Sequence, residues 1–244
     1  MAIPFLSIII PAHNEEYRLP ASLVKIDHFL ATQSFRSEVV IIENGSTDRT
    51  VDIIHDYQKR FPYIRLFQET RRGKGLAIKR GILEARGEYR FLADADLSMP
   101  IEEITKFIPP ALKDFDIAIA SRECMGAKRY DEPAYRHLIG RIFNTLVRTL
   151  ALPGLQDTQC GFKCFRAEVA EAVFPYQTLD GMSFDAEILF IARRFGYTIQ
   201  EVPIDWYYNA DSRVRLFQDS LQMAFDLLTI RFNTRRGLYG TKKV

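Results

Sequence analysis

Short apolar runs alternate with segments of helical spacing along the first half of this 244-residue chain. Five such runs, each five or six residues long, cover residues 5–10, 38–42, 63–67, 89–93 and 116–120. Runs of this length and composition are typical of buried strands. The amphipathic segments between them predict helices that end near residues 31, 60, 85 and 112, and Ser46 or Thr47 can cap the second of these helices. Alternating strands and helices predict an α/β fold with a mostly parallel central sheet and helices on both faces.

A further helix is predicted over residues 134–150, and its two faces differ. Helical spacing separates a polar stripe from an apolar one: His137, Arg141, Asn144 and Arg148 against Tyr135, Leu138, Ile139, Ile142, Leu146 and Leu150. Guanidinium groups match phosphate oxygens in geometry and charge, so the polar stripe is a candidate anion site. A solvated basic face on an ordinary amphipathic helix is the alternative.

The C-terminal part predicts one long helix over residues 214–232 and a basic tail. Its apolar arc is wide, comprising Phe217, Leu221, Ala224, Phe225, Leu228 and Phe232, broadened by Leu216, Met223 and Leu227. The basic residues are Arg231, Arg235, Arg236, Lys242 and Lys243. This arrangement suits a membrane surface with anionic headgroups. It also suits a helix packed on the core with a solvated tail, and both interpretations stay open here.

Composition narrows the class of protein. Hydrophobic residues make up 47% and charged residues 26% of the chain, which is typical of a soluble globular domain. A formal net charge of +2 provides no broad field for nucleic acid. Cys124, Cys160 and Cys164 are too few for a disulfide framework or a zinc site, and they fit a reducing cytosol. No stretch approaches the ~20 apolar residues of a membrane span.

Two carboxylates follow the fourth apolar run, at Asp94 and Asp96. Acids at the end of a buried strand are costly unless they bind something. In open α/β sheets, ligands lie outside the carboxyl ends of the strands. Mg²⁺ and Mn²⁺ bind through one or two carboxylates plus substrate phosphates. The pair therefore predicts a metal-held phosphate compound, with a solvated acidic turn as the alternative.

The common nucleotide motifs are absent or incomplete. Gly73-Lys74-Gly75 begins like a dinucleotide fingerprint, but Ile78 stands where the third glycine belongs. No Walker loop is present. Residues 11–15, after the first strand, contain no glycine, which argues against a sugar nucleotidyltransferase.

Several motifs in one order resemble the inverting nucleotide-sugar glycosyltransferases of the GT-A fold. These motifs are residues 8–16 (Ile-Ile-Ile-Pro-Ala-His-Asn-Glu-Glu), 43–50 (Glu-Asn-Gly-Ser-Thr-Asp-Arg-Thr), 73–75 (Gly-Lys-Gly) and 94–96 (Asp-Ala-Asp). Later motifs narrow the resemblance to polyprenyl-phosphate sugar synthases, of the dolichyl-phosphate β-glucosyltransferase and dolichyl-phosphate mannose synthase type. They are Ser121-Arg122, Arg136, residues 140–144, 157–163, 184–187, 201–204 and Ser212-Arg213.

The resemblance implies a domain organisation and a donor site. A glycosyltransferase domain would span residues 1–210, with a nucleotide-sugar half (1–120) and an acceptor half (121–210), before a helical extension over 211–244. Donor contacts would come from Pro11, Ala12, Asn14, Glu16, Glu43, Asn44, Lys74, Asp94, Ala95, Asp96 and Arg213. Asp94 and Asp96 would bind Mg²⁺ or Mn²⁺. Glu43-Asn44 stands where the family often has two aspartates, so uracil and guanine both remain open as the base.

The resemblance also implies an acceptor site and catalytic groups. Arg122, Arg136 and Arg141 would bind the acceptor phosphate, and Asp96, Asp157, Asp185 and Arg141 are the candidate catalytic residues. A lipid monophosphate has a second pKa of about 6 and is largely dianionic at neutral pH. It needs positioning and charge neutralisation more than deprotonation, whereas a hydroxyl acceptor needs a base. Asp157 or Asp185 would be that base.

The expected activity is inverting transfer of a hexose, with glucose favoured, from a nucleotide sugar, with UDP-glucose favoured, to a polyprenyl (dolichyl or undecaprenyl) phosphate. The alternatives are a GDP-mannose donor, a glycan or soluble hydroxyl acceptor, and a sugar-nucleotide-binding protein without turnover. The expected location is cytoplasmic, peripheral on the cytosolic membrane face. Moving a polyprenyl tail out of the bilayer costs about 0.8 kcal/mol of free energy for each CH₂ exposed to water, so the enzyme must come to the lipid.

Overall fold

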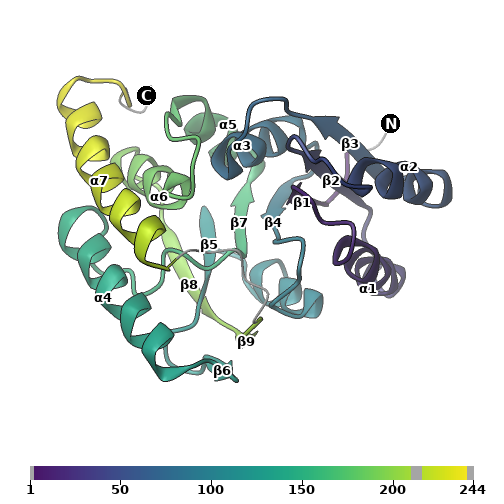
Figure 1. The fold of residues 1–244 in the computed structure, drawn as a ribbon, viewed down its shortest axis with the longest axis horizontal. Coiled ribbons are helices and arrows are strands. Elements are labelled where there is room, and N and C mark those ends of the chain that lie inside the picture. Colours follow the sequence, from purple (N-terminus) through teal and green to yellow (C-terminus); the bar gives the residue numbers. More distant parts are fainter. Residues whose placement is uncertain (1–2, 210–215, 241–244) are drawn as a thin grey trace.

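The computed structural model describes residues 3–209 and 216–240, arranged around one seven-stranded sheet (Figure 1). The strands are β1 (Leu6–Ala12), β2 (Ser37–Glu43), β3 (Ile64–Gln68), β4 (Tyr89–Leu92), β5 (Ile117–Ser121), β7 (Lys163–Arg166) and β8 (Ile199–Pro203). Their order is β3-β2-β1-β4-β7-β5-β8. Every neighbouring pair is parallel except those of β7, which runs antiparallel to β4 and β5. The predicted α/β class and mostly parallel sheet are confirmed.

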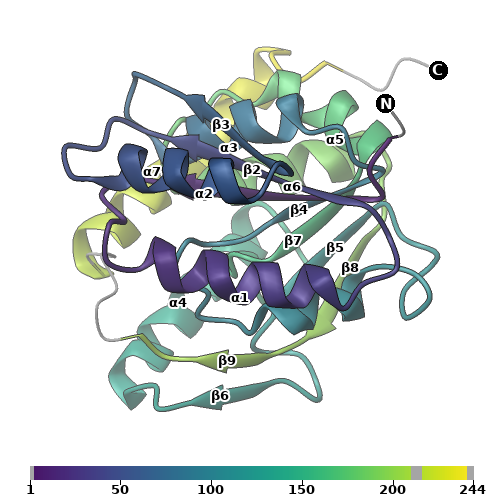
Figure 2. The same ribbon diagram turned by 90° about the vertical axis from the view of Figure 1, so that its right-hand side faces the viewer.

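Helices cover both faces of the sheet because its central strands are apolar on both sides. Ile8 and Ile10 of β1 pack with α1 (Leu19–Ala31) and η1 (Ile101–Phe107), a 3₁₀ helix. The intervening Ile9 packs with helices of the opposite face. The helices of this second layer are α3 (Lys74–Glu84), α5 (Ala167–Val173), η2 (Phe174–Tyr176) and α6 (Phe184–Arg194). Figure 2 shows α1 below the sheet and α3 and α5 above it.

Two local predictions were wrong. The helix expected to end near residue 112 is the 3₁₀ helix η1, which stops at Phe107, because Pro109 and Pro110 cannot donate the hydrogen bonds of a continuing helix. Ser46 or Thr47 was expected to cap α2 (Thr50–Arg60). Neither hydroxyl caps it, and the Asp48 carboxylate instead accepts from the Thr50 amide at 3.0 Å.

The last two long helices lie side by side at the end of the molecule opposite α1 and α2 (Figure 1). α4 spans Ala134–Leu150, as predicted, and α7 spans Leu216–Arg235. The Arg231 guanidinium donates to the Leu150 carbonyl at 2.6 Å, which fixes where the two helices meet. Leu227 and Ile230 of α7 are buried in the core, so α7 packs on the domain.

The first part of the apolar stripe of α4 faces outward, whereas Leu146 and Leu150 near the end of the helix pack against the core. Tyr135, Leu138 and Ile142 are 59%, 61% and 63% exposed, while Asn144 of the polar stripe is buried. Among residues 221–235 of α7, the exposed large apolar residues are Leu221, Phe225, Leu228 and Phe232. These seven residues are called the outer apolar surface below. A small parallel sheet of β6 (Lys128–Tyr130) and β9 (Asp205–Tyr207) lies next to α4 in Figure 1.

Candidate active site

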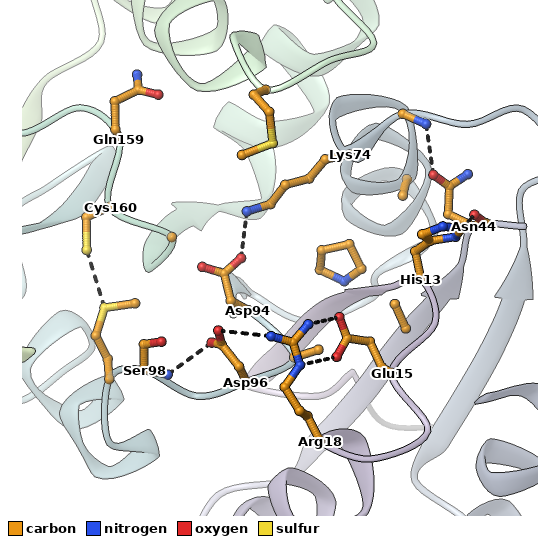
Figure 3. A pocket seen from close by; sticks show the side chains of 18 of the residues that line it. His13, Glu15, Arg18, Asn44, Lys74, Asp94, Asp96, Ser98, Gln159 and Cys160 are labelled. Carbon is orange, nitrogen blue, oxygen red and sulfur yellow. Dashed lines mark hydrogen bonds and ion pairs between the residues drawn. The ribbon is translucent and has the colours of Figure 1, made fainter. Parts of the chain in front are cut away.

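A cavity of about 540 Å³ opens at the carboxyl ends of the central strands (Figure 3). Its walls come from the chain just after β1, β2, β4 and β5, as expected for an open α/β sheet. The lining residues are Pro11, Ala12, His13, Glu15, Arg18, Asn44, Arg72, Gly73, Lys74, Ala77, Asp94, Ala95, Asp96, Ser98, Met99, Arg122, Gln159, Cys160, Gly161, Met182 and Trp206.

Asp94 forms an ion pair with Lys74, whose Nζ lies 2.7 Å from Oδ1 (Figure 3). Burial favours the neutral acid, but the ammonium of Lys74 outweighs it and holds the pKa of Asp94 below its usual value. Gly161 packs against the other carboxylate oxygen, because a Cβ there would lie 1.9 Å from Oδ2. Asp94 is therefore a charged carboxylate whose position depends on a glycine two residues before β7.

Asp96 points into the same cavity from the turn after Asp94 (Figure 3). Its Oδ1 accepts the Ser98 amide at 3.1 Å, and its Oδ2 lies 3.8 Å from Nη1 of Arg18. Arg18 also binds both carboxylate oxygens of Glu15, at 2.7 and 2.6 Å. The two acids of the Asp-Ala-Asp motif thus face two different cations.

Asn44 holds the loop that carries Lys74. Its side-chain amide donates to the Glu69 and Arg71 carbonyls, at 3.1 and 2.5 Å, and accepts from the Gly73 amide at 2.9 Å. Gly73 and Gly75 pack on the backbone of residues 179–181 so closely that a Cβ on either would clash. The glycines of the Gly-Lys-Gly motif therefore permit close packing of two loops.

Three predicted donor residues lie outside the cavity lining and brace the 44–50 loop. The Asn14 amide oxygen accepts from the Thr47 amide at 2.7 Å. Glu16 accepts from the Arg49 amide at 3.2 Å, and Glu43 accepts from the Ser46 amide. The predicted residues that do line the cavity are Pro11, Ala12, Asn44, Lys74, Asp94, Ala95, Asp96 and Arg122. Arg213 lies outside the described residues.

Arg122 lines the opposite wall and is held by Asp157. Its Nε and Nη2 donate to Oδ2 and Oδ1 of Asp157 at 2.6 and 3.0 Å, and its Cζ lies 5.3 Å from the Trp206 ring centroid. Burial opposes ionisation of Asp157, but Arg122 outweighs it and lowers the pKa to about 2. Asp157 is itself fully buried, and the structure does not bring it to the cavity.

Asp185 and Glu187 lie behind the cavity, on the first turn of α6. Asp185 pairs with the buried Lys163 at 2.6 Å, and burial raises its pKa despite that partner. Glu187 accepts hydrogen bonds from four donor groups: the Thr178 amide and hydroxyl, the Leu179 amide and the Tyr239 hydroxyl. Neither carboxylate lines the cavity.

Arg136 and Arg141 of α4, which were predicted to bind the acceptor phosphate, do not line the cavity. Arg141 is exposed on the helix surface. The guanidinium of Arg136 lies over the Tyr208 ring, 5.2 Å from its centroid. Sequence reasoning missed Arg18, Arg72, Met182 and Trp206 as lining residues. Each of the four lies within two residues of a quoted motif (8–16, 73–75, 184–187 and 201–204), and that proximity is the signal that could have found them.

The carboxylate oxygens in the cavity suit a hard divalent cation whose coordination a substrate would complete. Asp94 and Asp96 offer carboxylate oxygens to one cavity, which suits Mg²⁺ or Mn²⁺. Among the described residues, no group of three or more His, Cys, Asp or Glu side chains could hold a metal alone. Oxygens from a phosphate-bearing substrate would therefore complete the coordination.

Known proteins are similar to this chain in sequence or in fold. Dolichyl-phosphate β-glucosyltransferase of Dictyostelium discoideum is 35% identical and covers 98% of this chain and 77% of its own length. The human protein of that name is 32% identical, with 96% and 77% covered. The structure resembles glucosyl-3-phosphoglycerate synthase of Mycobacterium tuberculosis with Mn²⁺, UDP-glucose and phosphoglyceric acid (TM-score 0.65, 16% identity, 98% of this chain and 81% of that chain).

The fold is of the GT-A type. A family model described as glycosyl transferase family 2 matches residues 7–174. The chain belongs to glycosyl transferase family 2.

Proposed function

We propose that this enzyme transfers glucose, with inversion, from UDP-glucose to a polyprenyl phosphate such as dolichyl phosphate. The observation that carries the proposal is the 35% identity to a dolichyl-phosphate β-glucosyltransferase along 98% of the chain. The cavity supports it, because carboxylates and cations face each other there at the carboxyl ends of the strands.

The donor half supplies a place for a diphosphate. Asp94 and Asp96 would hold Mg²⁺ or Mn²⁺, which would neutralise charge on the leaving diphosphate. Lys74 projects into the same space and can neutralise a phosphate oxygen. Asn44, Gly73 and the 178–181 loop fix the backbone on either side of Lys74, so its ammonium has a defined origin.

The acceptor half presents one guanidinium to the cavity. The hydrogen bonds from Arg122 to Asp157 use Nε and Nη2 but not Nη1. Nη1 can therefore donate a hydrogen bond to a phosphate oxygen of the acceptor. In the transfer, a phosphate oxygen of the acceptor forms the new bond to the anomeric carbon, while the bond from that carbon to the UDP oxygen breaks. The dianionic acceptor carries no proton to remove, so the buried ion pairs of Asp157 and Asp185 need no base function.

We further propose that the outer apolar surface docks on the cytosolic face of a membrane. Among the described helices, none is long and apolar enough to cross a bilayer. The proposal comes instead from seven large apolar side chains exposed along two neighbouring helices. Leu and Phe side chains of this kind enter the interfacial region of a bilayer. Such docking brings the enzyme to a substrate whose tail stays in the bilayer.

A turnover screen tests the proposed function. UDP-glucose and GDP-mannose are each offered with dolichyl phosphate, undecaprenyl phosphate and a soluble hydroxyl acceptor, in the presence of Mg²⁺ or Mn²⁺. We expect glucosyl lipid from UDP-glucose. Mannosyl lipid alone would identify the GDP-mannose alternative, and product with the hydroxyl acceptor alone would overturn the lipid assignment.

A further inference from the structure

Each acid of the Asp-Ala-Asp motif is paired with a cation of the protein itself. Lys74 lies 2.7 Å from Asp94, and Arg18 lies 3.8 Å from Asp96 (Figure 3). The two cations come from separate elements, Lys74 from the start of α3 and Arg18 from the N-cap of α1. All four side chains line the same cavity.

The charges around these pairs also alternate in sign. Behind Lys74 lies Asp185, which is paired with Lys163, and beside Arg18 lies Glu15. Carboxylates and cations at this end of the cavity therefore nearly balance. A divalent cation brought alone to Asp94 and Asp96 would meet Lys74 and Arg18 at close range, in a partly buried site where repulsion is poorly screened.

The backbone of Lys74 is held in place, whereas its long flexible side chain can redirect the ammonium. The backbone is fixed because Gly73 and Gly75 pack on residues 179–181. The side chain is 27% exposed toward the cavity, so Nζ can move from Asp94 to another anion nearby. A diphosphate is such an anion, since it carries two negative phosphate groups and also ligates the metal.

We propose that Lys74 and Arg18 make the metal and the diphosphate bind as one unit. By pairing with Asp94 and Asp96, the two cations oppose the binding of a metal ion that arrives without the diphosphate. When metal and diphosphate arrive together, the carboxylates go to the metal and Lys74 goes to the diphosphate, so the local charge stays balanced. This inference rests on the proposed nucleotide-diphosphate donor and deepens it, because it states why the metal alone is a poor ligand.

Calorimetric titration measures this coupling without turnover. Mn²⁺ is titrated into wild type, Lys74→Met and Arg18→Met, each with and without saturating UDP. For wild type we expect Mn²⁺ to bind at least ~10-fold more tightly with UDP, within the usual range of coupling between two ligands. For Lys74→Met we expect tighter Mn²⁺ binding without UDP and a smaller gain on adding it. Arg18→Met should shift both values in the same direction by less, because its pair is longer.

Lys59→Met is the matched control. Lys59 pairs with Asp56 at 2.8 Å on α2, outside the cavity, and its loss should leave both Mn²⁺ affinities unchanged. Unchanged Mn²⁺ binding to both cavity variants without UDP would overturn the inference, whatever nucleotide is used. Equal Mn²⁺ affinity of wild type with and without UDP would also overturn it, provided that UDP binds. A wild type that binds Mn²⁺ but never UDP would instead refute the proposed donor.

Discussion

The Asp157 carboxylate accepts two parallel hydrogen bonds from Arg122, one from Nε at 2.6 Å and one from Nη2 at 3.0 Å. The Arg122 amide also donates to the same carboxylate, at 3.1 Å. A carboxylate bound in this way fixes the plane of the guanidinium, and it has little basicity left. Arg122 therefore enters the cavity wall with a set orientation, against Trp206.

Replacing Asp157 by asparagine should impair use of the acceptor. The amide keeps the volume but turns one hydrogen-bond acceptor into a donor, so Arg122 loses its orientation. We expect kcat/KM for polyprenyl phosphate to fall by about 10- to 100-fold, the size of one charged hydrogen bond, with Mn²⁺·UDP affinity unchanged. If Asp157 were a base, the variant would instead lose an inflection in the pH profile of kcat.

The same pair should make folding stability depend on acidity. The pKa of Asp157 is about 2 in the folded protein and 3.8 for the ordinary group. A lowered pKa stabilises the fold above the ordinary value, and the contribution is lost as pH falls from about 4 through 2. The loss should be on the order of 2 kcal/mol. Urea unfolding at pH 6 and pH 3 measures about 1 kcal/mol of this loss, because pH 3 still lies above the folded pKa, and wild type should lose more stability than Asp157→Asn. An equal loss in both would contradict the assignment.

Gly161→Ala should disable the donor site without unfolding the protein. A methyl group at 161 would lie 1.9 Å from Oδ2 of Asp94, so that carboxylate must move. A displacement of about 1 Å in a reacting site can cost about 100-fold in rate. We expect a loss of that size, together with weaker Mn²⁺ binding in the presence of UDP. Gly140→Ala, where a Cβ has open space, is the control and should retain both.

Asp96→Ala should abolish activity. It removes one of the two carboxylates available to a metal in the cavity, and metal ions contribute several kcal/mol to such reactions, so we expect a loss of about 1,000-fold or more. Activity of wild type should require Mg²⁺ or Mn²⁺. A folded Asp96→Ala protein that is fully active in the presence of a chelator would disprove the metal site.

Polar substitutions on the outer apolar surface should weaken membrane binding. Each buried Leu, Ile or Phe contributes about 1.5–3 kcal/mol, so the pairs Phe225→Ser/Leu228→Ser and Leu138→Ser/Ile142→Ser should each reduce liposome flotation at least ~10-fold.

The matched control for flotation is Val24→Ser/Leu83→Ser, which changes exposed apolar residues on α1 and α3. It should float like wild type, and equal flotation of all the variants would leave the surface without a membrane role. Truncation after Asn233 is a poorer test, because it removes Tyr239, which is fully buried and bonds to Glu187.

The sequence by itself determined most elements of the first half of the chain and the position of two acids at one strand end. Strands β1, β2 and β4 were predicted to within two residues, and α4 at both ends, because continuous apolar runs and helical spacing are local properties. The metal candidates Asp94 and Asp96 were also predictable, since two acids directly after a buried strand are costly unless they bind something.

Tertiary structure alone decided which side chains meet across the cavity. Insertion of the antiparallel β7 between β4 and β5 places Gly161 on Asp94, and no local signal gives that pairing. Arg18 lies close to Asp96 although the two residues are 78 positions apart in the sequence. Helical spacing divided α4 into two stripes but could not say which one faces the domain. In the fold, Asn144 and Val147 are buried and Leu146 and Leu150 pack on the core, while Tyr135, Leu138 and Ile142 stay in solvent.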